Sequence, residues 1–433
     1  MKILIVGNGG REHALAWKAA QSPLAERVYV APGNGGTAHE PGVENLPIAG
    51  DDVPVLVRFA IEQAIDLTII GPEAPLVAGV VDAFNAAGLR CFGPTRDAAQ
   101  LEGSKAFTKD FLTHHRIPTA AYGVFTETDP ALAYLRRVGA PIVIKADGLA
   151  AGKGVILAED LATAEAAVQD MLGAGRFGSA GNRVVIEEFL TGEEASFIVM
   201  VDGTHVLPLA TSQDHKARDD GDRGPNTGGM GAYSPAPIVT PVIHDRVMRE
   251  VIEPTVAGLA AEGIRYVGFL YAGLMIAADG TPKVLEYNCR LGDPETQPLL
   301  MRLESDLVEL WLAAIEGRLD QVKATWDPRP ALGVVMAAGG YPDSYETGHP
   351  IRGLDAAMPS DVKVFQAGTK ADGSSILTNG GRVLCVTALG DSVSAAQSLA
   401  YRGVEKIAWE GCQFRHDIGY RAIARERSSR RSP

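Results

Sequence analysis

The most informative stretch of this sequence is Pro282-Lys283-Val284-Leu285-Glu286-Tyr287-Asn288. Its composition predicts a strand, and alternate side chains of a strand point to the same face. Glu286 and Asn288 therefore place a carboxylate beside a carboxamide oxygen. Hard oxygen ligands of this kind suit Mg²⁺, which proteins usually bind together with substrate phosphates. We therefore expect these two residues to be metal ligands.

Two upstream segments carry groups suited to phosphate. Lys145 ends the β-branched run Ile142-Val143-Ile144 and offers a compact positive charge. The loop after it, Gly148-Leu149-Ala150-Ala151-Gly152-Lys153-Gly154, is built of small residues whose backbone amides can fold over an anion. Together with the metal-type strand, these segments indicate a site for a nucleoside triphosphate.

The bulk composition predicts a multidomain globular protein. A chain of 433 residues is too long for one core, because single cores rarely grow beyond about 250–300 residues. The net charge of −13 disfavours nucleic acid as a partner. No stretch approaches the roughly 20 apolar residues of a membrane helix, and the apolar run from Ile3 to Val6 is too short for a signal peptide. The four cysteines are scattered without a CxxC pair, so we expect no disulfide or zinc site, a reducing compartment and a cytoplasmic location.

The first hundred residues predict a parallel α/β sheet. Apolar runs at 2–6, 28–30, 66–70 and 88–92 alternate with helical segments. Ligands of such sheets bind beyond the carboxyl ends of the strands. The glycine turns at 7–13 and 33–36, and also Glu73, fall at those ends.

The turn that starts Gly7-x-Gly9 allows three interpretations. A dinucleotide site is disfavoured because Glu12 stands where the fingerprint has its last glycine, and no acid follows the second strand. A second alternative is a turn needed only for close strand–helix packing. We favour capture of a phosphate by amides at the helix start, with Arg11 close by.

The middle of the chain predicts a helix over 101–115, which carries Lys105 and Lys109, and then a small α+β lid. The lid is expected to be mobile and to close over nucleotide. Its last strand, at 183–188, ends in acids; it either holds adenine through backbone groups, with Glu194 on the ribose, or is simply a solvated acidic end.

Residues 211–235 are rich in glycine and charge, so local propensity predicts a long loop. A substrate-binding role is favoured over a solvated loop.

A helix at about 243–262 and a strand at 266–276 follow this loop. Further on, Arg290 offers a fork for a carboxylate or phosphate, with a surface salt bridge as its alternative role. We expect residues from Ala422 to Pro433 to fray. The predicted divisions are a substrate domain at 1–103, a core at 104–120 and 191–328, a lid at 121–190, an α+β cap at 329–427 and a tail at 428–433.

Seven motifs, in order, resemble the ATP-grasp ligases and, within them, the glycinamide ribonucleotide synthetase (phosphoribosylamine–glycine ligase) family. They are GNGGREHA (7–14), APGNGGT (31–37), GPEAPL (71–76), IKADGLAAGKGV (144–155), EEFLTGEEAS (187–196), QDHKARDDGDRGPNTGGMGAYSP (213–235) and EYNCRLGDPETQ (286–297). The resemblance implies a pre-ATP-grasp domain, an ATP-grasp domain with a lid and a C-terminal domain. It also implies a purine-biosynthetic reaction in which ATP and Mg²⁺ or Mn²⁺ serve to join glycine to 5-phosphoribosylamine through glycyl phosphate.

The resemblance also implies residue roles. Phosphates would contact Lys105, Lys145 and the loop with Gly152, Lys153 and Gly154, adenine would contact Glu187, Glu188, Phe189 and Leu190, ribose would contact Glu194, and metal would bind Glu286 and Asn288. The substrates would contact Gly9, Gly10, Arg11, Gly33, Asn34, Glu73, Asp214, Lys216, Asn226, Thr227, Gly228 and Arg290. Of these residues, Lys145, Arg290 and Asp214 are the expected catalytic ones.

Two features depart from the family pattern. Ala217 stands where an arginine often follows the lysine of the DHK motif, and the strand at 270–275 lacks the carboxylate metal ligand that many ATP-grasp enzymes carry. Rival interpretations are an ATP-grasp enzyme acting on bicarbonate or formate, a non-catalytic nucleotide sensor, and a nicotinamide oxidoreductase. We expect a monomer, with a dimer as the alternative, and neither nucleic acid nor membrane as a partner.

Overall fold

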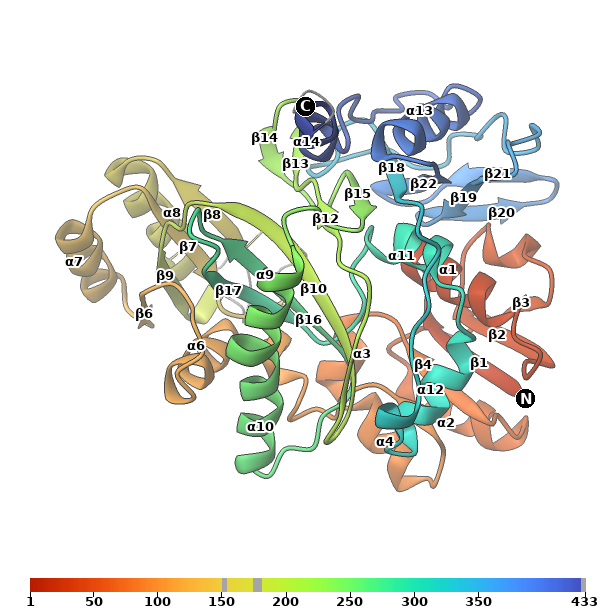
Figure 1. Ribbon diagram of the computed structural model, residues 1–433, viewed down its shortest axis with the longest axis horizontal. Coiled ribbons are helices and arrows are strands. Elements are labelled where there is room, and N and C mark those ends of the chain that lie inside the picture. The colour runs from red at the N-terminus through yellow and green to blue at the C-terminus, as the bar shows by residue number, and fades with distance from the viewer. Residues whose placement is uncertain (150–153, 174–180, 430–433) are drawn as a thin grey trace.

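The computed structural model of the protein describes residues 1–149, 154–173 and 181–429. Three parts surround a central antiparallel sheet: an N-terminal sheet, a small lid and a C-terminal sheet (Figure 1). The predicted multidomain fold is confirmed. All four cysteines are free, as expected.

The N-terminal sheet has the strand order β3-β2-β1-β4-β5, and every pair in it is parallel. Residues Ile3 to Val6 of β1 are fully buried, because parallel sheets of this kind carry helices on both faces. The strands are β1 (Lys2–Gly7), β2 (Arg27–Pro32), β3 (Val43–Asn45), β4 (Leu67–Ile70) and β5 (Cys91–Phe92). The helices are α1 (Gly10–Ala19), the 3₁₀ turn η1 (Thr37–His39), α2 (Val53–Glu62), α3 (Glu73–Ala78) and α4 (Val80–Ala86).

The lid is an antiparallel sheet of order β6-β9-β7-β8 with two helices packed against it. It projects from the rest of the molecule, at the left of Figure 1. Its elements are β6 (Tyr122–Phe125), α7 (Thr128–Val138), β7 (Ile142–Ala146), β8 (Val155–Ala158), α8 (Leu161–Gly173) and β9 (Val184–Glu188). Gly152 and Lys153 of the predicted phosphate loop lie outside the described residues.

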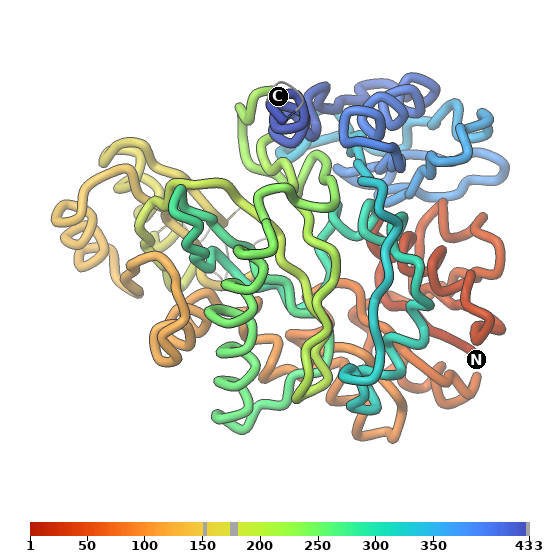
Figure 2. Tube along the Cα trace, viewed as in Figure 1, coloured from red at the N-terminus to blue at the C-terminus, as the bar shows by residue number. Residues whose placement is uncertain are grey.

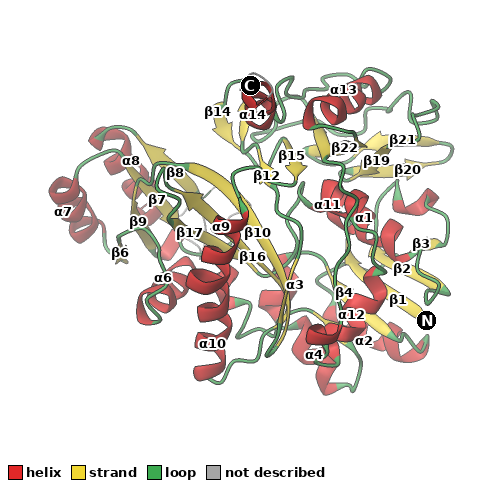
Figure 3. Cartoon of the chain, in the orientation of Figure 1, coloured by secondary structure: helices red, strands yellow, loops and turns green. Residues whose placement is uncertain are grey.

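The central sheet, of order β11-β10-β16-β17, carries the metal-type strand at its edge. Figure 3 shows its long strands crossing the middle of the molecule beside α9 and α10. Its strands are β10 (Glu193–Asp202), β11 (Val206–Pro208), β16 (Val267–Ile276) and β17 (Pro282–Asn288). The neighbouring helices are α5 (Gln100–Gly103), α6 (Lys105–His114), α9 (Pro241–Val247), the π-helical turn η3 (Met248–Ile252), α10 (Glu253–Ala261), α11 (Thr296–Arg302), α12 (Leu307–Ile315) and the 3₁₀ turn η4 (Leu319–Gln321).

The single helix predicted over 101–115 is wrong, because the chain breaks at Ser104. Ser104 has an extended backbone, with φ −138° and ψ 114°, and its hydroxyl accepts a hydrogen bond from the Phe107 amide. A serine in this position caps the next helix. Lys105 therefore begins α6.

The C-terminal sheet has the order β12-β15-β18-β22-β19. Its elements are β12 (Gln213–Asp214), β15 (Gly231–Ser234), β18 (Ala331–Ala337), β19 (Val362–Gln366), β22 (Arg382–Leu389) and α13 (Val393–Val404). The predicted long loop is thus partly wrong, because β12 and β15 pair into this sheet and β13 (Ala217–Asp219) pairs with β14 (Arg223–Asn226). Tertiary partners, rather than local propensity, decide such short strands. A second hairpin joins β20 (Thr369–Asp372) and β21 (Ser375–Thr378).

The prediction of a frayed end from Ala422 is also wrong for the described residues. Tyr420–Ser429 form α14, whose Ala422 and Ile423 are buried in the C-terminal core. Arg425 makes two contacts with Glu193, at 2.6 and 2.5 Å. The tube view places the dark blue helix α14 beside the green segment that carries the β13–β14 hairpin (Figure 2).

Asp222, in the turn of that hairpin, accepts hydrogen bonds from Arg415 at 2.9 Å, Tyr420 at 2.6 Å and Arg421 at 2.5 Å. The Arg415 side chain is fully buried. We expect Asp222→Ala to lower the free energy of unfolding by about 3 kcal/mol, because it deprives a buried guanidinium of a carboxylate. Urea unfolding measures this change, and Asp220→Ala, at the exposed pair with His416, is the matched control. Equal stabilities of the two variants would contradict the prediction.

Candidate active site

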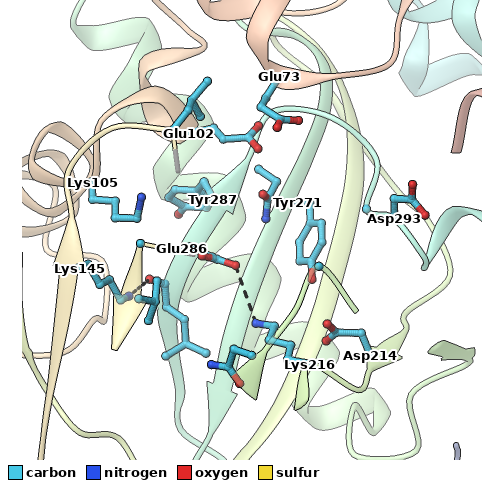
Figure 4. A pocket seen from close by; sticks show the side chains of 18 of the residues that line it. Glu73, Glu102, Lys105, Lys145, Asp214, Lys216, Tyr271, Glu286, Tyr287 and Asp293 are labelled. Atoms are coloured by element: carbon cyan, nitrogen blue, oxygen red, sulfur yellow. Dashed lines mark hydrogen bonds and ion pairs between the residues drawn. The ribbon is translucent and has the colours of Figure 1, made fainter. Parts of the chain in front are cut away.

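A cavity of about 570 Å³ lies where the four parts of the chain meet. Figure 4 shows Lys105 and Lys145 on one side of it, Glu286 near its centre, and Asp214 and Lys216 on the other side. Most of the described residues predicted for the site line this cavity: Gly9, Arg11, Glu73, Lys105, Lys145, Gly154, Glu187, Glu188, Phe189, Leu190, Glu194, Asp214, Lys216, Asn226, Thr227, Gly228, Glu286, Asn288 and Arg290. The tertiary structure thus gathers groups that are up to 281 residues apart (Gly9 to Arg290).

The metal-type strand presents Glu286 and Asn288 to the cavity. Glu286 pairs with Gly273 of β16, where an added Cβ would lie 3.2 Å from the Glu286 side chain. The position opposite Glu286 thus leaves room for this carboxylate. Although burial opposes ionisation, Lys216, Lys145 and Lys105 hold the pKa of Glu286 below its ordinary value.

These two side chains fit a divalent cation. An ionised carboxylate and a carboxamide oxygen are hard donors. The Lys216 Nζ lies 3.8 Å from the Glu286 carboxylate and helps to keep it ionised. No other ligand is assigned here.

Two lysines from different elements lie on the same side of the cavity (Figure 4). Lys105, at the start of α6, donates to the Gly148 carbonyl at 3.1 Å. Lys145, on β7, donates to the Leu285 carbonyl at 3.1 Å and lies 3.0 Å from a Glu187 oxygen. Burial lowers the pKa of Lys105. Lys105 is thus held by one backbone carbonyl, and Lys145 by a backbone carbonyl of the metal-type strand and the Glu187 carboxylate.

The Glu187–Leu190 segment borders an apolar part of the cavity. Phe189 is 37% exposed, and Leu149, Leu157 and Met275 also line the cavity. Glu194 lies beyond this segment, with its carboxylate 2.9 Å from the Lys216 ammonium. A flat apolar base and a polar sugar fit this succession of surfaces.

Asp214 and Lys216 enter from the segment that joins the C-terminal sheet. Burial raises the pKa of Asp214 to about 7; Lys216 opposes that rise, and Glu295, Glu194 and Glu286 add to it. The Thr227 hydroxyl donates to the Lys216 carbonyl at 2.9 Å, which ties the two ends of the hairpin segment together. The Ala217 carbonyl accepts from Arg415 at 3.1 Å, so the departure at 217 leaves the backbone of this motif held.

Arg290 lies between two carboxylates. Its guanidinium is 2.7 Å from Glu102 and 3.3 Å from Glu73. Burial raises the pKa of Glu102. Burial also opposes ionisation of Glu73, but Arg290, Arg11, a backbone hydrogen bond and Arg382 together lower its pKa. This is a half-buried cluster at the cavity wall rather than the fully exposed salt bridge that was its alternative role.

The glycine turn at the start of α1 differs from the favoured phosphate interpretation. The Gly9 amide donates to the Glu12 carboxylate at 2.6 Å, and Arg11 Nε is 2.5 Å from the same carboxylate. Glu12 therefore supplies the negative charge that a helix start attracts. At Gly7, with φ +133°, an added Cβ would lie 2.5 Å from Glu12, so this side chain also requires the glycine.

A second cavity of about 270 Å³ adjoins the first, between the N-terminal and C-terminal domains. Gly9, Gly33, Asp293, Gly368 and Arg382 are among its lining residues. Gly10 and Asn34 line neither cavity. The Asn34 amide instead donates to the Asn8 and Gln366 carbonyls, at 2.9 and 2.8 Å, and fastens the two domains together.

Several residues of the main cavity were not assigned from the sequence. They include Glu12, Glu102, Lys109, Tyr271, Asp293, Glu295, Tyr341 and Arg382. Asp293 and Glu295 belong to the motif that continues from β17, and its charge was the available signal. Tyr341 and Arg382 come from the C-terminal domain and carry no local signal.

The fold and the site define an ATP-grasp ligase. Models of the phosphoribosylglycinamide synthetase N domain, ATP-grasp (A) domain and C domain match residues 1–102, 103–296 and 331–421. The chain belongs to the phosphoribosylglycinamide synthetase family. This confirms the predicted resemblance.

Relatives match along their whole length. A phosphoribosylamine–glycine ligase of Allochromatium vinosum is 79% identical over 99% of this chain and 100% of its own, and one of Escherichia coli is 66% identical with the same coverage. A crystal structure of phosphoribosylamine–glycine ligase from Thermotoga maritima has a TM-score of 0.83 and 34% identity over 96% of this chain and 100% of its own. A biotin carboxylase from Campylobacter jejuni, at 13% identity and a TM-score of 0.73 over 95% of this chain and 92% of its own, shares the fold alone.

Within the described residues, no helix is both long and apolar enough to cross a membrane.

Proposed function

We propose that this chain joins glycine to 5-phosphoribosylamine in purine biosynthesis, converting ATP to ADP and phosphate. The observation that carries the proposal is one cavity lined by four lysines, a metal-type carboxylate and carboxamide, and the Arg290 cluster. Relatives that are 66–79% identical along the whole chain bear the name of this ligase. We also propose that the active form is a monomer, with a dimer as the alternative.

The chemical difficulty is that a carboxylate is a poor acyl donor. Transfer of the γ-phosphoryl group of ATP to glycine gives glycyl phosphate, and the amine of phosphoribosylamine then displaces phosphate. Positioning and charge neutralisation supply most of the catalysis in such transfers. This demand matches a site rich in charged side chains.

The described residues take the following roles in our proposal. Lys105 and Lys145 neutralise nucleotide phosphates, the Glu187–Leu190 backbone holds adenine and Glu194 holds ribose. Glu286 and Asn288 would hold Mg²⁺ or Mn²⁺, which would offset charge on the phosphates. Arg290, Glu73, Lys216 and the Asn226–Gly228 segment orient the two co-substrates, with Gly9, Gly33 and Arg382 at the adjoining cavity.

Asp214 is the group we propose as proton acceptor for the attacking amine. Because its pKa is about 7, it is ionised above pH 7 and protonated below it. We expect the rate at saturating ATP to fall as the pH drops through about 7, and Asp214→Asn to slow the reaction about a hundredfold and remove that dependence. Steady-state rates between pH 5.5 and 9 measure this. An unchanged profile in Asp214→Asn would reject the role.

Phosphate release tests the proposed reaction directly. Purified protein receives ATP, magnesium, glycine and freshly made phosphoribosylamine, and each component is omitted in turn. Sustained release is expected only from the complete mixture.

Bicarbonate and formate, each replacing glycine, separate the proposed ligase from other ATP-grasp activities. Release with either of them, and none with glycine, would contradict the proposal. A nucleotide sensor, the other rival, would bind ATP without releasing phosphate.

A further inference from the structure

Lys109 is a buried cation that the proposed reaction does not use. Its side chain, on α6, is 2% exposed, and its Nζ lies 2.8 Å from Glu187. Glu187 is also 2% exposed and lies 3.0 Å from Lys145. One buried carboxylate therefore sits between two ammonium groups, one from a core helix and one from the lid.

The two lysines differ in what else holds them. Lys109 donates to the Thr119 hydroxyl at 2.7 Å, and Thr119 donates in turn to the Val284 carbonyl of β17 at 2.7 Å. The other partner of Lys145 is the Leu285 carbonyl. Both lysines line the cavity and both are tied to the metal-type strand, Lys109 through Thr119 and Lys145 directly at Leu285. Lys145 is the more exposed of the two, at 8% against 2%.

This difference has a consequence for phosphate binding. A lysine that turns toward a phosphate loosens its contact with Glu187, and a buried carboxylate left without a cation is strongly disfavoured. With Lys109 in place, Glu187 keeps one ammonium partner throughout. Without Lys109, the same carboxylate would hold Lys145 and compete with the nucleotide for it.

We propose that Lys109 is a positioning residue of the nucleotide site, which neutralises Glu187 and so frees Lys145 to bind the nucleotide phosphates. The inference rests on the proposed role of Lys145 in phosphate binding. It assigns to Glu187 a side-chain function distinct from the backbone contact with adenine.

Calorimetric binding of ATP with magnesium to the full-length chain, without co-substrates, tests the inference. We expect Lys109→Met to weaken binding about tenfold and Lys109→Arg to stay within about threefold of the parent protein. The decisive variant is Lys109→Met combined with Glu187→Gln, which removes the competing carboxylate. It is expected to regain most of the lost affinity, since Lys145 is then unrestrained.

The single variant Glu187→Gln needs no lysine replacement and gives an independent reading if Lys109→Met folds poorly. We expect it to bind ATP at least as tightly as the parent protein. Lys18→Met, at a partly buried lysine beside Trp17 and remote from the cavity, is the control for loss of one ammonium group.

The inference is overturned if the double variant binds ATP no more tightly than Lys109→Met, or if Glu187→Gln binds ATP tenfold more weakly than the parent protein. Lys109 would then be a packing residue. The measurement involves neither glycine nor phosphoribosylamine. Tight binding with the expected order of variants therefore supports the role of Lys109 even where the phosphate-release test contradicts the proposed ligation.

Discussion

Alanine in place of Glu286 is expected to slow ligation about a thousandfold or more at ordinary magnesium concentration. The carboxylate is ionised, faces the cavity beside Asn288 and lies 3.8 Å from Lys216. Its loss removes the charged donor for the divalent cation and leaves the phosphates less neutralised in the transition state. Initial rates of phosphate release with all substrates present measure the effect.

Two further variants assign this loss to the charge. Glu286→Gln keeps an oxygen at nearly the same place and is expected to lose most of the activity as well, because a neutral amide binds hard cations less strongly. Glu253→Ala, at an exposed position on α10, serves as the matched control and is expected to keep the parent rate. Near-normal turnover by Glu286→Ala would refute the metal role.

Alanine in place of Arg290 is expected to lower kcat/KM for the co-substrates about a hundredfold while the affinity for ATP changes less than about threefold. Arg290 lies at the cavity wall, between Glu73 and Glu102. Its guanidinium offers a planar fork for a carboxylate or a phosphate, and no contact joins it to the nucleotide-binding lysines in the described structure. The informative result is therefore a large fall in kcat/KM for the co-substrates together with a nearly unchanged affinity for ATP.

The neighbouring acids add a stability effect. Glu102 is buried, and without Arg290 its raised pKa should rise further, since an opposite charge favours ionisation. We expect Arg290→Ala also to unfold at a lower urea concentration. Arg290→Lys keeps the charge without the fork, so it should recover stability more fully than kcat/KM. Unchanged kinetics in both variants would reject a role in substrate binding.

Local pattern was sufficient for the elements that carry short-range signals. The alternation in Pro282–Asn288 predicted both the strand and the shared face of Glu286 and Asn288, and the β-branched run predicted the strand that carries Lys145. The seven motifs predicted the family. Ser104 broke the predicted helix through a local capping bond, to the Phe107 amide three residues on, which the helical pattern of 101–115 did not reveal. Local pattern also failed where partners are distant, because β12 and β15 exist only as part of the sheet that β18 continues.

The sequence by itself determined the family, the order of the elements and the residue types for nucleotide, metal and co-substrates, because these reside in contiguous motifs. Only the tertiary structure decided that Arg290 lies between Glu73 and Glu102, that α14 holds Asp222 and that Lys109 shares Glu187 with Lys145. These contacts join residues 42 to 217 positions apart (Lys109 or Lys145 with Glu187, Arg290 with Glu73 or Glu102, Arg421 with Asp222). Their charges are readable from the sequence, but burial and pairing are set by packing.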